Sequence, residues 1–235
     1  MIKTHFFGKE CIIDKSLQER RNLKQHLQKI SFEYDNLLML NQVHGKDVVL
    51  IDHVDKIYGD QDLPKADGIV CNLKNVAIAI VTADCSPILM WDDERQIIAA
   101  VHAGWRGAKA GVIGEAVKLM RRMGAKIIKA KIGPMIQQYS YEVAQDFYDE
   151  FMQEDQRNKK FFFDNKQLQR LFFDLSAYVE EKLNDSDVVS VNNCQTDTYS
   201  SLSSFFSYRR STHLGETNCG RNVSVIVNNN TIPHL

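Results

Sequence analysis

The sequence lacks the long apolar runs, the one-sided charge and the paired cysteines that mark several large classes of protein. No apolar stretch approaches the roughly 20 residues that cross a bilayer, and no long apolar run follows a basic region near the first residue. We therefore expect neither a membrane span nor a signal peptide. Lysine and arginine number 29 against 30 acidic residues, a formal charge of −1. Nucleic-acid binders usually show a basic excess, so this balance argues against that class.

Cysteine is sparse, with five residues scattered over a chain of 235. No CxxC pair occurs, which disfavours zinc ribbons and thioredoxin-type redox pairs. An odd number of cysteines without a signal peptide fits a reducing compartment, and we therefore expect a cytoplasmic protein. The five are Cys11, Cys71, Cys85, Cys194 and Cys219.

What the sequence does contain is the composition of an ordinary globular protein. Hydrophobic residues make up 44% and charged residues 25%, which excludes the disordered and fibrous classes. A chain of this length buries roughly 70% of its unfolded surface and needs no disulfide bonds for stability. The length lies between one and two typical domains, and we expect a single domain over residues 1–235.

Apolar periodicity predicts four helices and a series of short buried strands. A helix at 14–30 has candidate N-caps at Asp14 and Ser16 and apolar positions at Leu23, Leu27 and Ile30. Helices and strands follow one another in mixed order, which favours an α+β fold with mixed sheets. The other helices are expected at 108–123, 141–153 and 167–183, and the strands at 37–51 (two runs broken at His44-Gly45), 68–71, 76–81, 87–91, 97–101, 127–132, 188–191, 205–208 and 223–227.

Three short segments each place a possible metal ligand at the end of an apolar strand, beside small or turn-forming residues. NQVHG carries His44, TADCSP carries Cys85 and VHAGWRG carries His102. Two imidazoles and one thiolate suit zinc, or copper, and three protein ligands leave a fourth position for water, which is the catalytic arrangement. The three lie far apart in the sequence, so only tertiary folding can bring them together. Taken singly, each also fits a plain structural role, since a lone buried cysteine usually acts as a small hydrophobe.

Together, in this order, the three segments resemble the laccase-domain family, also called the YfiH-type or multicopper polyphenol oxidoreductase family. The resemblance continues through ADGIV at 66–70, IGP at 132–134, YEV at 141–143, CQT at 194–196, FFSYRR at 205–210 and GRNVSVIV at 220–227. It covers most of the chain beyond about residue 35. The chain departs from the family after IGP, where MIQQYSYEV has none of the cysteines that often follow, and this argues against additional copper ligands there.

The resemblance implies a fold, a metal and a reaction. Mixed β-sheets would pack together with helices on the outside, and His44, Cys85 and His102 would bind zinc. The implied reaction is phosphorolysis of adenosine or inosine to the free base and ribose 1-phosphate, with methylthioadenosine phosphorolysis and adenosine deamination as associated activities. Purine nucleoside and phosphate are then the expected partners, with no nucleic acid and no membrane, and the sequence indicates no particular oligomeric state.

Several polar residues near these segments are candidates for substrate contacts. Arg106 follows His102 in a Gly-flanked turn before a predicted helix, and an arginine fork suits phosphate oxygens. Arg209 and Arg221 are further candidates from SYRR and GRN. Asn41, with its neighbour Gln42, is a candidate for hydrogen bonds to the ribose or the base.

Asp84, directly before Cys85, fits two roles equally. It is a candidate catalytic proton carrier or partner of a histidine, and it is also a candidate structural acid that caps a turn. For aromatic Trp105 and Tyr208, stacking on a purine and packing in the core are both open. Arg210 is a further candidate for phosphate, and a surface ion pair fits it better than it fits Arg209.

Three other functions use the same residues. Cys85 with a histidine would make a thiolate–imidazole pair for acyl transfer, as in a cysteine-type hydrolase or amidase that edits a peptidoglycan precursor. A polyphenol oxidase-like copper protein is a second alternative, although seven histidines and scattered cysteines do not readily furnish several copper sites. A protein that binds metal or nucleoside without turnover is the third.

Overall fold

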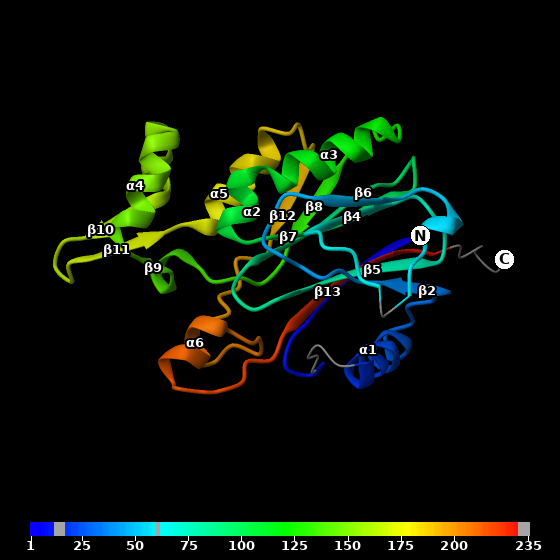
Figure 1. The fold of residues 1–235 in the computed structure, drawn as a ribbon, viewed down its shortest axis with the longest axis horizontal. Helices are drawn as coiled ribbons and strands as arrows, with labels where there is room; N and C mark the ends of the chain where they lie inside the picture. The colour runs from blue at the N-terminus through cyan, green and yellow to red at the C-terminus, as the bar shows by residue number, and fades with distance from the viewer. Residues whose placement is uncertain (12–16, 60–61, 230–235) are drawn as a thin grey trace.

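The computed structural model describes residues 1–11, 17–59 and 62–229. Two β-sheets stack between helices, and a third, smaller sheet lies at one end with helix α4 (Figure 1). In spatial order, the larger sheet has the strands β12 (Ser190–Asn193), β8 (Lys129–Ile132), β6 (Ser86–Asp92), β7 (Ile97–Ala103), β4 (Gly68–Cys71) and β3 (Val48–Ile51). The second sheet has β1 (Ile2–Phe7), β13 (Asn222–Asn228), β5 (Val76–Thr82) and β2 (Asn36–Leu38), and the third has β10 (Phe162–Asn165), β11 (Arg170–Phe173) and β9 (Glu142–Val143).

Helices lie outside the two stacked sheets, and the sheets themselves are mixed. β3 pairs in parallel with β4, and β12 with β8, whereas the central pairs of the larger sheet are antiparallel. This confirms the α+β class with mixed sheets. The α-helices are α1 (Leu17–Lys29), α2 (Trp105–Ala110), α3 (Val112–Arg122), α4 (Gln145–Glu154), α5 (Leu175–Asn184) and α6 (Tyr208–His213), and short 3-10 helices span Val54–Lys56, Gln138–Ser140 and Gln156–Phe161.

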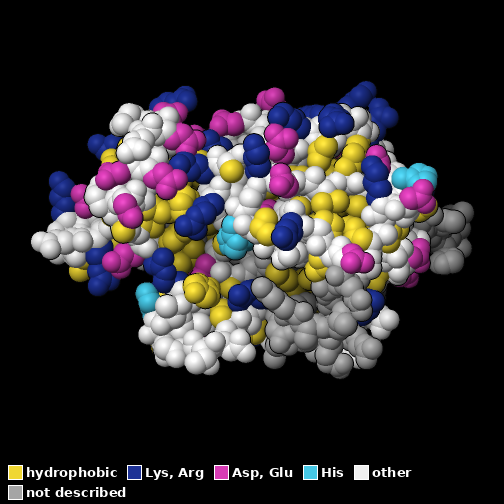
Figure 2. Space-filling view, in the orientation of Figure 1, with side chains coloured by type: hydrophobic (Ala, Val, Ile, Leu, Met, Phe, Trp, Pro, Cys, Tyr) yellow, Lys and Arg dark blue, Asp and Glu magenta, His cyan; other side chains and the backbone are white. Residues whose placement is uncertain are grey.

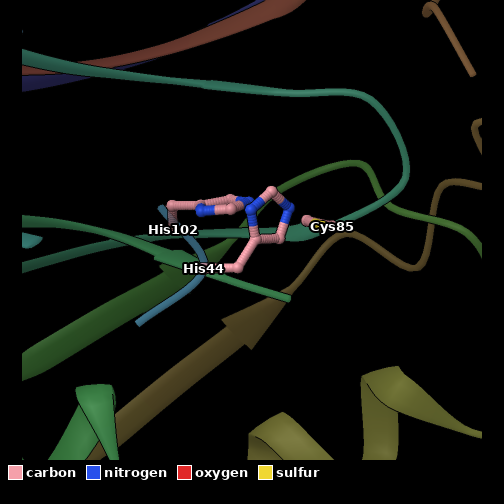
Figure 3. A group of neighbouring side chains, drawn as sticks. All are labelled: His44, Cys85 and His102. Carbon is pink, nitrogen blue, oxygen red and sulfur yellow. The ribbon is translucent and has the colours of Figure 1, made fainter. Parts of the chain in front are cut away.

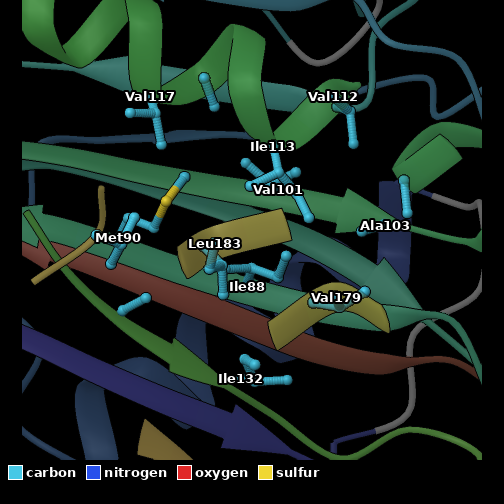
Figure 4. Packing of buried hydrophobic residues seen from close by; sticks show 14 of the residues in the cluster. Ile88, Met90, Val101, Ala103, Val112, Ile113, Val117, Ile132, Val179 and Leu183 are labelled. Carbon is cyan, nitrogen blue, oxygen red and sulfur yellow. The ribbon is translucent and has the colours of Figure 1, made fainter. Parts of the chain in front are cut away.

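The two faces of the larger sheet bury different partners because strand side chains alternate in direction. On β7, Ala99 and Val101 belong to the cluster that α3 and α5 complete, whereas Ile98 and Ala100 pack toward the second sheet. Figure 4 shows Val101 and Ile88 beneath α3. The outer face of the second sheet packs against α1 through buried leucines, so the layers run helix, sheet, sheet, helix.

Leu23 and Leu27 are buried at this contact, as the sequence predicts. The candidate caps of the same helix, Asp14 and Ser16, lie outside the described residues. Strand β1 was not predicted, and it pairs with β13 along its whole length.

The predicted helix at 108–123 is wrong at its start and in its continuity. Helix α2 already begins at Trp105, and Gly111 separates it from α3 with a φ of 97°. This left-handed conformation is easy for glycine and interrupts a continuous helix. Arg106 therefore lies inside the first turn of a helix and not in a turn before it.

The predicted helix at 167–183 is wrong in its first half. Residues Arg170–Phe173 form strand β11, which pairs with β10 and β9, and Leu168 is exposed at the turn. The helix starts only at Leu175, where the Asp174 side chain accepts a hydrogen bond from the Ala177 N–H at 2.8 Å. The apolar residues of β11 match a helical period by chance, and strand pairing decides their conformation.

Two further boundaries differ from the prediction. The helix expected at 141–153 begins only at Gln145, because Glu142–Val143 pairs with β11. The strand expected at 205–208 is absent from the described residues, because Ser207 caps helix α6 by accepting a hydrogen bond from the Arg210 N–H at 3.1 Å.

On the face shown in Figure 2, lysine and arginine side chains are interspersed with aspartate and glutamate. Within the described residues, no helix has the length and apolar character that crossing a membrane requires.

Candidate metal centre and its cavity

Three side chains from separate segments meet at one end of the larger sheet. His44 comes from the loop after β2, Cys85 directly precedes β6, and His102 lies near the end of β7. Their possible ligand atoms all lie within 4.8 Å of one another. Figure 3 shows the three side chains directed toward one another.

Strand register explains why Cys85 and His102 meet. In the antiparallel β6–β7 pair, Ser86 stands opposite Ala103 and Pro87 opposite His102. Cys85, just before β6, and Gly104, just after β7, therefore lie side by side. On the other side of β7, Gly68 pairs with Val101, which places Asp67 opposite His102. Two antiparallel pairings thus bring residues that are distant in sequence to one edge.

Asp67 is a buried carboxylate that contacts both histidine segments, and the sequence analysis missed it. Its Oδ1 lies 2.8 Å from Nδ1 of His102, and its side chain is fully buried. The same carboxylate accepts hydrogen bonds from the backbone N–H groups of Val43 (3.3 Å), His44 (2.9 Å) and Gly45 (2.6 Å). Burial alone would raise the pKa of Asp67, but the His102 ring and these N–H groups lower it.

The electrostatics of the cluster favour a thiolate. Burial opposes ionisation of Cys85, but the neighbouring His102 and His44 outweigh it and lower the pKa of the Cys85 thiol to about 6. Burial likewise opposes protonation of His102, and Cys85 and Asp67 outweigh it and raise the His102 pKa. The thiolate is the form of cysteine that binds metal.

The donor set and the space around it fit a zinc ion. From the usual zinc–sulfur and zinc–nitrogen bond lengths, two ligands of one tetrahedral ion stand roughly 3.5 Å apart, so small side-chain movements suffice. A methyl group at Gly104 would stand 2.9 Å from Cys85 Sγ and 3.2 Å from His44 Cδ2, which shows that glycine keeps this space open. Within residues 1–11, 17–59 and 62–229, this is the one cluster of three or more potential metal ligands.

The cluster opens into a cavity of about 770 Å³. Pockets of this size commonly bind small molecules. Eight of the candidate site residues from the sequence analysis line it, namely Asn41, His44, Asp84, Cys85, His102, Arg106, Arg209 and Arg221. Apolar and aromatic side chains, among them Ile136, Leu175 and Tyr141, complete the wall.

The three arginines of the cavity differ in how far they are already engaged. Within the described residues Arg106 makes no hydrogen bond or ion pair, and its guanidinium lies over the Trp105 ring at 4.3 Å from the ring centroid. Arg209 donates through Nη1 to the Glu142 carbonyl at 2.9 Å. Arg221 donates through Nη1 to the carbonyls of Cys219 and Gly220 at 2.7 and 3.1 Å. Arg106 therefore has the most freedom to bind an anion.

Asp84 holds two neighbouring segments in place. Its Oδ1 accepts a hydrogen bond from the Thr198 hydroxyl at 2.6 Å, and its Oδ2 accepts one from the Arg209 N–H at 2.7 Å. Its φ of 86° also places it in a tight, left-handed turn. These contacts match the structural one of its two predicted roles.

Two other polar residues are engaged in the fold. The Gln42 amide pairs with the backbone of Val81 through both ends, at 2.7 and 2.8 Å. Arg210 donates to the carbonyls of Thr198, Ser200 and Phe205, and it forms no ion pair with any residue that the structure describes. Asn41 has an exposed side chain at the cavity wall and pairs with Lys65 through its backbone.

The aromatic candidates divide between core and cavity rim. Trp105 packs its ring at 4.8 Å, centroid to centroid, from the Phe147 ring, so it serves the core as well as the cavity wall. Tyr208 is exposed at the start of α6 and lines the cavity. Tyr141, which the sequence analysis did not single out, lies beneath Arg209, and burial raises its pKa.

Comparison with known sequences and structures gives a consistent set of relatives. A family model described as multi-copper polyphenol oxidoreductase laccase matches residues 10–229. A Rickettsia prowazekii protein named purine nucleoside phosphorylase is 40% identical over 184 residues, which cover 78% of this chain and 74% of that protein. An Aquifex aeolicus protein of the same name is 36% identical over 138 residues, covering 55% of this chain and 66% of that protein.

Solved structures agree with the fold. A Neisseria meningitidis protein superposes with a TM-score of 0.78 at 26% sequence identity, covering 97% of this chain and 94% of that one. A Bacillus licheniformis protein superposes with a TM-score of 0.82 at 22% identity, covering 96% and 92%. At this lower identity the second likeness is one of fold alone.

Proposed function

The chain belongs to the multi-copper polyphenol oxidoreductase laccase family, as its motifs predict, and we propose that it is a zinc-dependent purine nucleoside phosphorylase. Adenosine or inosine would react with phosphate to give the free base and ribose 1-phosphate, with methylthioadenosine as a related substrate and adenosine deamination as a second activity. One observation carries the proposal: a His–Cys–His donor set and an unengaged arginine face the same cavity. The names of the Rickettsia and Aquifex relatives support the substrate class.

Phosphate is the substrate for which the cavity offers a free charged group. In phosphorolysis a phosphate oxygen bonds to C1′ of the ribose while the bond from C1′ to the purine nitrogen breaks, and the departing base keeps the electron pair and takes up a proton. Arg106 would hold the phosphate, because its guanidinium can donate to two oxygens and has no competing partner among the described residues. Arg209, in α6, and Arg221, directly before β13, also line the cavity and would add positive charge.

The purine and ribose would occupy the rest of the cavity. Tyr141 and Tyr208 offer ring faces, and Leu175 offers an apolar surface, which suits a flat base. Asn41 offers an exposed amide at the wall for a ribose hydroxyl or the base. Asp84 would act by holding the Arg209 segment, through the hydrogen bond to the Arg209 N–H.

His44, Cys85 and His102 would hold the zinc ion. An open-site zinc supplies Lewis-acid activation of water near neutral pH, which is the chemistry that deamination of adenosine requires. The chain lacks the motif of zinc nucleobase deaminases, so this activity would use a different scaffold. Copper has the same donor preferences, and the single cluster among the described residues favours one metal ion over several.

A cysteine-type hydrolase is a second candidate, favoured by the lowered pKa of Cys85 beside His102. The two functions make opposite demands on Cys85. A bound metal occupies the sulfur and both imidazoles, whereas a hydrolase needs a free thiolate nucleophile. Chelation should therefore abolish the first activity and spare the second, and a thiol alkylator should abolish the second.

Elemental analysis combined with a phosphate-dependent assay of base release tests the proposal. The purified protein should contain about one zinc per chain and release adenine or hypoxanthine only when phosphate is present. His102→Ala should lose zinc and base release together. Undiminished phosphorolysis by a metal-free protein would contradict the proposal, as would nucleoside binding with no base released on prolonged incubation.

A further inference from the structure

We propose that Asp67 is the positioning residue of the metal site, a single carboxylate that sets the orientation of both histidine ligands. This inference rests on the zinc site of the proposed function. It concerns a residue that does not itself line the cavity but contacts two residues that do, His44 and His102. The carboxylate lies behind the ligands and is fully buried.

Asp67 fixes which nitrogen of His102 faces the site. A carboxylate only accepts hydrogen bonds, so the 2.8 Å contact between its Oδ1 and His102 Nδ1 requires the proton on Nδ1. Nε2 is then the nitrogen left for a metal. The backbone adds a second restraint, because the His102 N–H donates to the Asp67 carbonyl at 2.7 Å.

The same carboxylate fixes His44 through its backbone. His44 has a φ of 61°, a left-handed conformation that non-glycine residues adopt infrequently. Three successive N–H groups, those of Val43, His44 and Gly45, converge on Asp67 and hold the loop in this conformation. These bonds hold the backbone that carries the His44 ring near Cys85.

An amide cannot replace this carboxylate. Oδ1 accepts from His102 Nδ1 and the His44 N–H, whereas Oδ2 accepts from the Val43 and Gly45 N–H groups. In Asp67→Asn, an NH₂ group takes the place of one oxygen and meets donors instead of offering an acceptor. Either the His102 contact or the loop contact is lost.

The chain offers a matched control in Asp92. This carboxylate is also fully buried and also accepts four hydrogen bonds, in its case all from backbone N–H groups, those of Glu94, Arg95, Lys126 and Ile127. It lies at the opposite end of β6, where Asp92 pairs with Ile97, and it contacts no histidine in the described structure. Asp92→Asn therefore reproduces the loss of a buried carboxylate without touching the metal site.

The test is a zinc titration of the full-length apo protein against a competing chelator at pH 7. Asp67→Asn should weaken zinc binding roughly 10- to 100-fold, the usual effect of removing the carboxylate partner of a ligating histidine. Asp92→Asn should leave the zinc affinity within about twofold of wild type. Equal zinc affinity in wild type and Asp67→Asn would overturn the role of Asp67, as would an equal loss in both variants.

A wild-type protein that binds no zinc would instead overturn the proposed zinc site, and this role with it. A measurement on the wild type covers the case in which Asp67→Asn does not fold. In the zinc-loaded protein, ¹⁵N NMR of the histidine rings should show His102 protonated at Nδ1 and metal-bound at Nε2. Metal at Nδ1 of His102 would overturn the proposal.

Discussion

Gly104 lies against Cys85 so closely that a single methyl group at position 104 would stand 2.9 Å from Cys85 Sγ. The same methyl group would stand 3.2 Å from Cδ2 of His44, so it would press on two of the three proposed ligands at once. The backbone φ of Gly104 is −69°, which any residue can adopt. Glycine is needed here for space and not for conformation.

We expect Gly104→Ala to weaken zinc binding by roughly 1–3 kcal/mol, the usual cost of overpacking, which corresponds to about a 5- to 150-fold loss of affinity. Gly114→Ala is the matched control, because the nearest atom to its added methyl group is Ser186 Oγ at 4.0 Å and the position is helical. That variant should bind zinc normally and be slightly more stable. Zinc titration and thermal unfolding measure both effects, and normal zinc affinity in Gly104→Ala would refute the steric argument.

Arg106→Ala should raise the KM for phosphate while leaving zinc content unchanged. Loss of a charge-assisted hydrogen bond costs about 1.5–3 kcal/mol, which corresponds to roughly a 10- to 150-fold increase in KM. The KM for phosphate of Arg106→Lys should lie between those of wild type and Arg106→Ala, because lysine keeps the positive charge but loses the two-pronged guanidinium.

Steady-state kinetics at varied phosphate concentration measure the KM of the Arg106 variants, with Arg122→Ala as the control. Arg122 is exposed at the end of α3 and does not line the cavity. An unchanged KM for phosphate in Arg106→Ala would transfer the role to Arg209 or Arg221.

Asp92 should make stability depend on pH. Burial alone would raise the pKa of its carboxyl. The hydrogen bonds that it accepts from four backbone N–H groups outweigh the effect of burial and lower the pKa. The lowered pKa means that the ionised carboxylate stabilises the folded state above the unfolded pKa of about 3.9, and that this contribution is lost as pH falls through the folded value.

Asp92→Asn should therefore reduce the free energy of unfolding by roughly 2–3 kcal/mol at pH 7. The difference from wild type should shrink as pH falls below about 4, because the carboxyl of unfolded wild type then takes up a proton, and the folded carboxylate does so at a lower pH. Urea denaturation of wild type and Asp92→Asn between pH 7 and pH 3 measures this difference in the free energy of unfolding. A difference that is constant over this range would rule out the carboxylate charge as its source.

Local sequence patterns predicted secondary structure correctly where the burial of the side chains agrees with the apolar pattern of the sequence. The strands at 68–71 and 76–81 are buried along nearly their whole length, so short runs of valine, isoleucine and alanine identified them. The same signals failed at Arg170–Phe173, because the apolar spacing of a helix and of a strand coincide over four residues, and only pairing with β9 and β10 separates them. Ser207 and Gly111 act as a helix cap and a helix break, roles that serine and glycine often take, but each lies within a stretch whose apolar pattern indicated a continuous strand or helix.

For the site, the sequence by itself determined the family and the candidate metal donors. His44, Cys85 and His102 stand out because each lies close to an apolar run and beside small or turn-forming residues, and the ordered motifs around them identify the laccase-domain relatives. Tertiary structure alone decided that the three meet, that Arg106 is the cavity arginine with no hydrogen bond or ion pair to the described residues, and that Asp67 stands behind both histidines. The physical reason is that strand register, set by packing across the whole sheet, places these residues side by side, and no local stretch of sequence contains that information.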